Sequence, residues 1–246
     1  MEISIAAEKI GEIYGLDITN SMLTSIIASL ILIIIAIIFR LIMNLKPGKI
    51  QNAIEIVFDF LINQIENVFG SFNEAKKYFP LLATIFLFII VNNWLGILPG
   101  IGTIGIYETI HGKEILVPYF RSGNADLNTT IALALITIIC VQIFGMLAIG
   151  VSKYLGKFFN FKNPIYFSIG ILEIISEFSR IISFSFRLFG NVFAGEVLLI
   201  IIAKLMPYFA PLPFYILEIF VGFIQALVFT MLAMVFIRMA TLKEEH

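Results

Sequence analysis

An arginine lies in the middle of a long apolar stretch near the C-terminus of the chain. Arg187 stands within the segment from Ile181 to Glu196, among isoleucine, leucine and phenylalanine side chains. A charge at bilayer depth costs from roughly 3 to more than roughly 10 kcal/mol, and ionisable residues there usually pair with a charge or move one. Arg187 therefore indicates a protein that handles ions inside a membrane.

Small and polar residues share one helical face with Arg187, and we call this face the polar stripe. At about 100° per residue, most of its members lie within about 40° of Arg187, and Gly190 lies at about 60°. The members are Glu173, Ser176, Arg180, Ser183, Arg187, Gly190, Asn191 and Ala194. Because small residues let another helix approach closely, the stripe predicts an electrostatic contact between Arg187 and a carboxylate on a partner.

Two alternatives concern the arginines of the stripe. Arg187 would be purely structural if it were neutralised within the chain by Glu218, Glu177 or Glu173. Arg180 stands nearer a helix end, where a long side chain can extend to the membrane interface. We therefore treat Arg180 only as an accessory candidate.

Acidic and amide side chains occur on both sides of Arg187. Glu196 lies about 180° from Arg187 on the same helix, while Glu218 and Gln225 share a face of the last helix because they are seven residues apart. If that face meets Glu196, the three line an outer polar path. A second group near the other helix end would line an inner path: Glu173, Ser176 and Glu177. Two such paths separated by one arginine describe an ion route with a block in its middle, although burial could instead keep any single carboxyl protonated.

The elements that must position these residues are membrane helices. We expect spans over 22–43, 79–98 and 126–150, an unbroken helix of about 40 residues over 165–206, and a last helix over 214–238. We expect Pro80 to begin the second span and a hairpin to form around 107–117. A lysine-containing loop is expected at positions 153, 157 and 162, and a proline turn at 207, 211 and 213.

Polar residues near the span ends are explained by the membrane interface and by helix capping, with Asp126 as an N-cap. They are Asn92, Asn93, Trp94, Asp126, Asn128 and Thr129. The segment 51–69 differs from the spans because its polar residues recur every three or four positions. We predict an amphipathic helix there that lies on the membrane surface or, alternatively, packs on a neighbouring subunit.

The whole chain is thus expected to form one all-α polytopic membrane domain over 1–246, with about five spans plus the amphipathic helix. Its parts are 1–78, the helical hairpin 79–150, and a long tilted antiparallel hairpin over 164–240 that conducts ions. Of 246 residues, 60% are hydrophobic and only 13% are charged, and the net charge of −1 gives no case for nucleic acid as a partner. Cys140 is the only cysteine, and His111 and His246 lie outside the apolar runs, so we expect no metal site and no cofactor.

Orientation follows from the lysine and arginine residues. One side collects ten of them, at positions 40, 46, 49, 76, 77, 153, 157, 162, 238 and 243, and the other has four, at 9, 113, 121 and 204. The N-terminus is therefore predicted to lie outside and the C-terminus in the cytoplasm.

The segment SFSFRLFGNVFAGE at 183–196 resembles the signature of subunit a of F-type ATP synthases. The segments NWLGILP at 93–99, ADLNTT at 125–130 and QALVF at 225–229 match the same family in the expected order. Together the matches span roughly residues 80–240, while the first 75 residues match only in layout. Two departures are that many members carry a histidine at the position of Glu196 or Glu218, and that the loop 102–121 is longer than in some members.

The resemblance implies a non-catalytic stator subunit beside a ring of c subunits. Peripheral-stalk b subunits, other ATP synthase subunits and the lipid bilayer would be its partners, in the plasma membrane of a bacterium. Arg187 would face the ring's ion-binding carboxylate and block leakage between two half-channels for H⁺ or Na⁺. Carried over by position, the outer half-channel would contain Asn191, Glu196, Glu218 and Gln225, and the inner one Glu173, Ser176 and Ser183.

Two other classes are weighed against this interpretation. A secondary cation or proton antiporter usually shows repeated halves with paired broken helices, and the sequence has neither. An intramembrane hydrolase needs a nucleophile with a base, and the sequence has no histidine in its apolar runs and no Gly-x-Ser-x-Gly motif.

Overall fold

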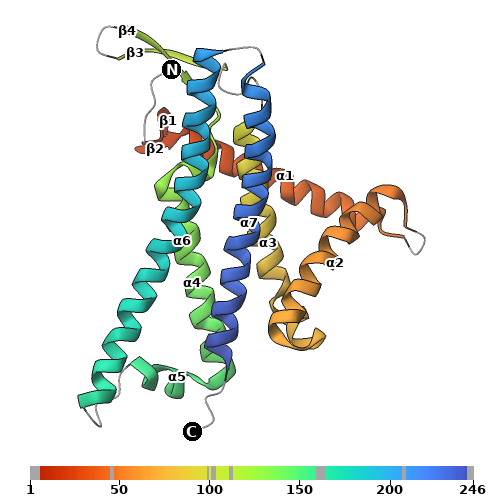
Figure 1. Cartoon of the computed structure of the whole chain (residues 1–246), viewed down its shortest axis with the longest axis vertical. Helices are drawn as coiled ribbons and strands as arrows, with labels where there is room; N and C mark the ends of the chain where they lie inside the picture. The colour runs from red at the N-terminus through yellow and green to blue at the C-terminus, as the bar shows by residue number, and fades with distance from the viewer. Residues whose placement is uncertain are drawn as a thin grey trace.

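The computed structural model describes residues 6–44, 47–98, 100, 104–110, 113–158, 164–206 and 209–242. Five of its helices are long and apolar enough to cross a membrane: α1 (Asn20–Ile42), α3 (Phe72–Ile97), α4 (Leu127–Ile149), α6 (Pro164–Leu205) and α7 (Pro211–Thr241). Helices α3, α4, α6 and α7 form a bundle, and α1 leaves it at a large angle (Figure 1). The predicted all-α polytopic fold is confirmed.

A β-hairpin that the sequence analysis missed precedes α1. Strands β1 (Lys9–Ile13) and β2 (Leu16–Thr19) pair antiparallel through a tight turn in which Tyr14 and Gly15 have positive φ angles of 52° and 82°. Positive φ at both central residues is typical of two-residue hairpins, because it matches the twist of the strands. Thr19 then caps α1 by accepting a hydrogen bond from the Met22 backbone N–H at 3.3 Å.

The predicted amphipathic helix is α2 (Lys49–Phe69), whose apolar side packs against α3. Aromatic rings meet across this contact, with ring centroids 4.6 Å apart for Phe69 and Tyr78. The prediction that Pro80 begins the second span is wrong, because the side chain of Ser71 caps α3 and the helix starts well before the proline. Pro80 therefore lies inside α3, where its missing N–H removes one hydrogen bond of the helix.

The loop after α3 contains the predicted hairpin, formed by β3 (Gly105–Ile110) and β4 (Lys113–Pro118). A single 3₁₀ turn, η2 (Gly123–Ala125), leads into α4, and Asp126 caps α4 as expected by accepting from the Asn128 N–H at 3.2 Å. Residues 99, 101–103 and 111–112 of this region lie outside the described residues.

Two of the lysines after α4 do not lie in a loop, which corrects the prediction for those two positions. Lys153 and Lys157 belong to the short helix α5 (Val151–Phe158), while position 162 lies outside the described residues. The proline turn also differs, since Pro211 occupies the first position of α7, where its fixed φ favours the start of a helix. Position 207 lies outside the described residues.

Helices α6 and α7 run side by side and antiparallel, as predicted, and α6 continues unbroken for 42 residues (Figure 1). At about 1.5 Å per residue it is about 63 Å long, roughly twice the thickness of the hydrocarbon layer. The rings of Phe184 and Phe229 join the two helices at a centroid distance of 4.5 Å. We call the end of the molecule that carries both β-hairpins the hairpin end, and the opposite end the α5 end.

Candidate functional site

The middle of the polar stripe lies on the surface of the molecule. Ser183, Arg187, Gly190, Asn191 and Ala194 are all exposed, although the rest of α6 is largely apolar. The stripe follows from sequence spacing alone, because residues three, four and seven positions apart share one side of a helix. What the structure adds is that no other helix of the described chain covers this part of α6.

Arg187 reaches only along its own helix. Its Nη2 donates a hydrogen bond to Ser183 Oγ at 3.2 Å, and among the described residues Arg187 forms no ion pair. The three glutamates considered as internal partners lie elsewhere: Glu177 pairs with Arg180, Glu173 pairs with Lys157 at 3.2 Å, and Glu218 rests against Gly195, about two turns further along α6. Among the described residues, Arg187 is therefore not neutralised by any of these three glutamates.

Arg180 is neutralised although it belongs to the same stripe. Its guanidinium pairs with the Glu177 carboxylate one turn earlier and lies 4.6 Å from the centre of the Phe236 ring. A planar guanidinium is well suited to such a combined ion pair and ring contact. The position of Arg180 is thus explained by contacts within the chain rather than by extension to the membrane interface.

A cavity of about 250 Å³ opens beside Arg187 toward the α5 end. Its polar lining comes from α6 and its apolar lining mainly from α7: Ser176, Ser179, Arg180, Ser183, Phe184, Arg187, Leu232 and Phe236. The structure therefore brings Ser176 and Ser183 together with Arg187. It places Glu173 and Glu177 outside this lining, each in its own ion pair.

Tyr154 of α5 is buried near these two ion pairs. Its hydroxyl donates to Gln142 Oε1 at 2.5 Å. Burial, followed by the nearby carboxylates Glu177 and Glu173, raises the pKa of Tyr154 to about 12. The phenol is therefore neutral well beyond ordinary cellular pH.

A larger cavity, of about 430 Å³, lies at the hairpin end on the side of α6 opposite Arg187. Glu196, Glu218 and Gln225 all line it, so the structure joins the three residues that the sequence places on facing helix sides. Arg121 and Asn93 line it as well. We call this space the hairpin-end cavity.

Glu218 reaches into this cavity through a gap left by a glycine of α6. A Cβ atom at Gly195 would lie only 2.0 Å from Glu218 Oε2, so the carboxylate rests against the bare backbone. Glu218 is 8% exposed, and no hydrogen bond or ion pair holds it within the part of the chain that the structure describes. Its carboxylate is thus enclosed but available to a ligand.

Asn191 connects the stripe to the cavity side of α7. Its Nδ2 donates to Gln225 Oε1 at 2.5 Å, and the Gln225 side chain also lines the hairpin-end cavity. Gln225 Nε2 is buried and has no hydrogen-bond acceptor among the described residues. The amide of Gln225 therefore stands between the exposed stripe and the enclosed cavity.

Asn93 and Trp94, near the end of α3, both donate hydrogen bonds to α7. Asn93 is buried, and its Nδ2 donates to the Gly222 carbonyl of α7 at 3.0 Å, while its Oδ1 accepts from Asn124 at 2.7 Å. Trp94 Nε1 donates to the Ile219 carbonyl at 3.1 Å. For Asn93 the interface explanation is corrected, because its buried amide joins α3 to α7 and lines the cavity. Trp94 also bonds to α7 but is exposed, which agrees with a position at the membrane interface.

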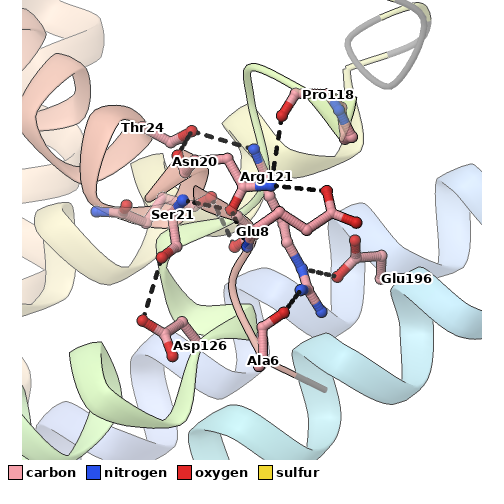
Figure 2. Close-up of polar contacts among 11 residues, drawn as sticks. Ala6, Glu8, Asn20, Ser21, Thr24, Pro118, Arg121, Asp126 and Glu196 are labelled. Carbon is pink, nitrogen blue, oxygen red and sulfur yellow. Dashed lines mark hydrogen bonds and ion pairs between the residues drawn. The ribbon is translucent and has the colours of Figure 1, made fainter. Parts of the chain in front are cut away.

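Sequence reasoning missed Arg121, which enters the sequence analysis only as a charge in the outer loop. In the structure it is 7% exposed, and its Nε donates to Glu196 Oε2 at 3.1 Å (Figure 2). The one available signal was that a lone arginine stands shortly before the segment ADLNTT that matches the family. Its partner could not be named, because the two residues are 75 positions apart.

The described residues contain no group of three or more histidine, cysteine, aspartate or glutamate side chains that could hold a metal ion. The fold and the site together define an all-α multi-pass membrane protein with an arginine on its surface and a carboxylate-lined cavity behind it.

Comparison with known proteins agrees with this class. The model of the family described as ATP synthase A chain matches residues 22–238. ATP synthase subunit a of Campylobacter jejuni is 35% identical over 206 residues, which cover 82% of this chain and 81% of the relative. The corresponding protein of Geotalea daltonii is 36% identical over 203 residues, covering 81% and 77%. The chain belongs to the ATP synthase A chain family and is a membrane-sector subunit of an F-type ATP synthase.

Proposed function

We propose that this chain is the ion-conducting stator of a bacterial F-type ATP synthase, which couples the flow of H⁺ or Na⁺ to rotation of a ring of c subunits. The observation that carries the proposal is Arg187, which is exposed on a strip of small residues and, among the described residues, bonded only to Ser183. An uncompensated cation at membrane depth is costly. A carboxylate on the ring would supply the missing countercharge.

Two routes lead toward Arg187 from opposite ends. The outer route passes through the hairpin-end cavity, which Glu196, Glu218 and Gln225 line, and Asn191 continues it to the stripe through its hydrogen bond to Gln225. The inner route uses the cavity that Ser176 and Ser183 line, with Glu173 and Glu177 at its α5-end entrance. In this arrangement the positive charge of Arg187 prevents a cation from passing directly between the routes.

The proposal places the hairpin end outside the cell and the α5 end in the cytoplasm, following the lysine and arginine bias of the sequence. The ring would lie against the polar stripe, while b subunits would hold the chain still. One elementary charge crossing about 100 mV releases about 2.3 kcal/mol, so several ions must pass for each ATP. A rotating ring of identical carboxylates provides such a repeated step.

The proposal is tested with the variant Arg187→Ala in the complete synthase, reconstituted in sealed vesicles. We expect loss of ATP synthesis driven by an ion gradient, by a factor of about a hundred or more, since removing one positioned electrostatic group typically has that effect. Copurification of the other subunits is measured to establish that the complex still assembles. Normal synthesis by the assembled variant would rule the proposed role out.

The outer route is tested with Glu218→Gln in the same vesicles. Because Glu218 lines the cavity at only one end of the molecule, ion access from the outer side should slow more than access from the inner side. Access from each side is measured as the dependence of synthesis, and of ATP-driven pumping, on the ion concentration at that side. Equal effects on both sides, or none, would remove Glu218 from the outer route.

A further inference from the structure

The two glutamates of the hairpin-end cavity have different surroundings. Glu196 is held by Arg121, whereas Glu218 has no hydrogen bond or ion pair within the described residues and rests against Gly195. Both line the same cavity. A cation or proton that binds Glu196 must first displace a guanidinium, and one that binds Glu218 need not.

Arg121 is held in place by more than its ion pair. Its Nη1 donates to the Ala6 carbonyl at 3.1 Å, and its backbone N–H donates to Thr24 Oγ1 at 3.2 Å (Figure 2). The guanidinium also lies 5.7 Å from the centre of the Phe193 ring. The N-terminal segment and α6 thus hold the guanidinium, while α1 holds the backbone of Arg121.

The segment that carries Arg121 is itself anchored on both sides. Before it, the Pro118 carbonyl accepts from Asn20 Nδ2 at 3.3 Å. After it, Ser122 Oγ donates to the Asn92 carbonyl at 3.1 Å, and Asp126 accepts from Ser21 Oγ at 3.1 Å. Figure 2 shows that this polar network joins the start of α1 to the loop between β4 and α4. A fixed backbone lets Arg121 hold Glu196 with little loss of side-chain freedom.

We propose that Arg121 is a positioning residue of the outer ion route, which keeps Glu196 in an ion pair as part of the cavity wall and so leaves Glu218 as the carboxylate that exchanges the ion. The proposal rests on the proposed function. It predicts that the route continues from Glu218 to Gln225 and Asn191 without using Glu196 as a relay.

Variants that neutralise Arg121 and Glu196 singly and together distinguish a structural ion pair from a relay in which Glu196 carries the ion. In Arg121→Gln the Glu196 carboxylate loses its countercharge and traps the ion, and in Glu196→Gln the unpaired guanidinium repels it. We expect each single variant to lower ion-driven ATP synthesis in sealed vesicles about tenfold or more, since residues in one ion pair are strongly coupled. The double variant removes both charges, and its rate should return to within about threefold of the wild type.

Two outcomes overturn the inference. If the double variant is as slow as Glu196→Gln, Glu196 carries the ion itself or Arg121 serves only as a tether. If Arg121→Gln is fully active, the ion pair has no part in the route. Should Arg121→Gln fail to copurify with the other subunits, Arg121→Lys takes its place, because a lysine keeps the positive charge. Near-normal synthesis by that variant supports the pair, and a loss as large as that of Glu196→Gln overturns it.

A matched control is the ion pair of Lys9 and Glu12, which lies at the same end with an N–O distance of 2.9 Å and about half of each side chain exposed. Neutralising Lys9 and Glu12, which also removes the pair between Lys9 and the exposed Asp17, should leave synthesis unchanged, because exposed pairs contribute little. Arg187→Ala is measured in parallel. If it is inactive while the Arg121 and Glu196 double variant is also inactive, only the present inference fails, whereas an active Arg187→Ala variant contradicts the proposed function.

Discussion

The charged residues on the two faces of α6 differ in whether another residue of the chain neutralises them. On the polar stripe, Arg187 is exposed and, among the described residues, bonded only to Ser183 of its own helix. On the opposite face, Glu196 is turned into a cavity and paired with Arg121 from a distant loop. Because a membrane charge needs a partner, Glu196 is neutralised by a residue of the same chain, whereas the proposed function supplies the partner of Arg187 from a second polypeptide.

The stripe itself contains the same contrast. Arg180 and Arg187 are two helical turns apart on one face, yet Arg180 pairs with Glu177 and packs on the Phe236 ring. A charged residue on the stripe is therefore not sufficient to imply a partner. What distinguishes Arg187 is the absence of a carboxylate within reach among the described residues.

Among substitutions at Gly190, Gly195 and Tyr154, the largest effect is expected where a larger side chain at Gly190 fills the polar stripe. Gly190 is exposed, and a Cβ atom there would meet nothing within 4 Å, so Gly190→Leu should leave the isolated chain undisturbed. If the c ring packs on the stripe, the added side chain overfills that contact, which typically costs about 1–3 kcal/mol and corresponds to about five- to a hundredfold. Ion-driven ATP synthesis in sealed vesicles should fall accordingly.

Gly156 offers a control for this change. It lies in α5, away from the stripe, and is equally open, with nothing within 4 Å of an added Cβ atom. Gly156→Leu should therefore retain normal synthesis. If the Gly190 and Gly156 variants were equally active, the stripe would not be a contact surface. The proposed difference between the two faces of α6 would then be wrong.

A smaller effect is expected on the cavity face. In Gly195→Ala the new Cβ atom would lie only 2.0 Å from Glu218 Oε2, so the flexible carboxylate must move away. A shift of about 1 Å in a reacting group can cost up to about a hundredfold, and we expect about tenfold slower synthesis at low outer ion concentration. Adding Glu218→Asp shortens the side chain and should recover part of the rate. Wild-type rates in Gly195→Ala would show that the position of this carboxylate does not matter.

The smallest effect is expected at Tyr154, where the nearby charges are already paired. Tyr154→Phe removes the hydrogen bond to Gln142 and should lower stability by about 1 kcal/mol without changing the rate of synthesis. Folding raises the pKa of Tyr154 to about 12, so its stabilising contribution is complete below about pH 10 and is lost as the pH rises toward 12. The difference in melting temperature between the purified wild-type complex and the Tyr154→Phe complex should therefore become smaller between about pH 10 and pH 12. A large loss of synthesis at neutral pH would instead place Tyr154 in the ion route.

Much of the fold is encoded locally and could be predicted from the sequence. In a membrane each helix must satisfy its own backbone hydrogen bonds, so apolar runs define the spans. Periodicity then places Arg187 and Ser183 on one face and Glu196 on the other. The errors arose where a local signal has two outcomes: Pro80 fits the start of a helix or its interior, and Asn93 fits the membrane interface or a bond between helices.

The sequence by itself determined that this is a membrane protein of its family, which residues share a helix side, and that one arginine stands amid apolar residues. Only the tertiary structure decided which faces meet. In the structure Glu196 pairs with Arg121 across 75 positions, and Glu218 rests against Gly195. Glu177 pairs with Arg180 and Glu173 pairs with Lys157, so neither of them pairs with Arg187. The physical reason is that helical periodicity depends on neighbours within two turns, whereas the partner of a charge depends on how distant segments pack.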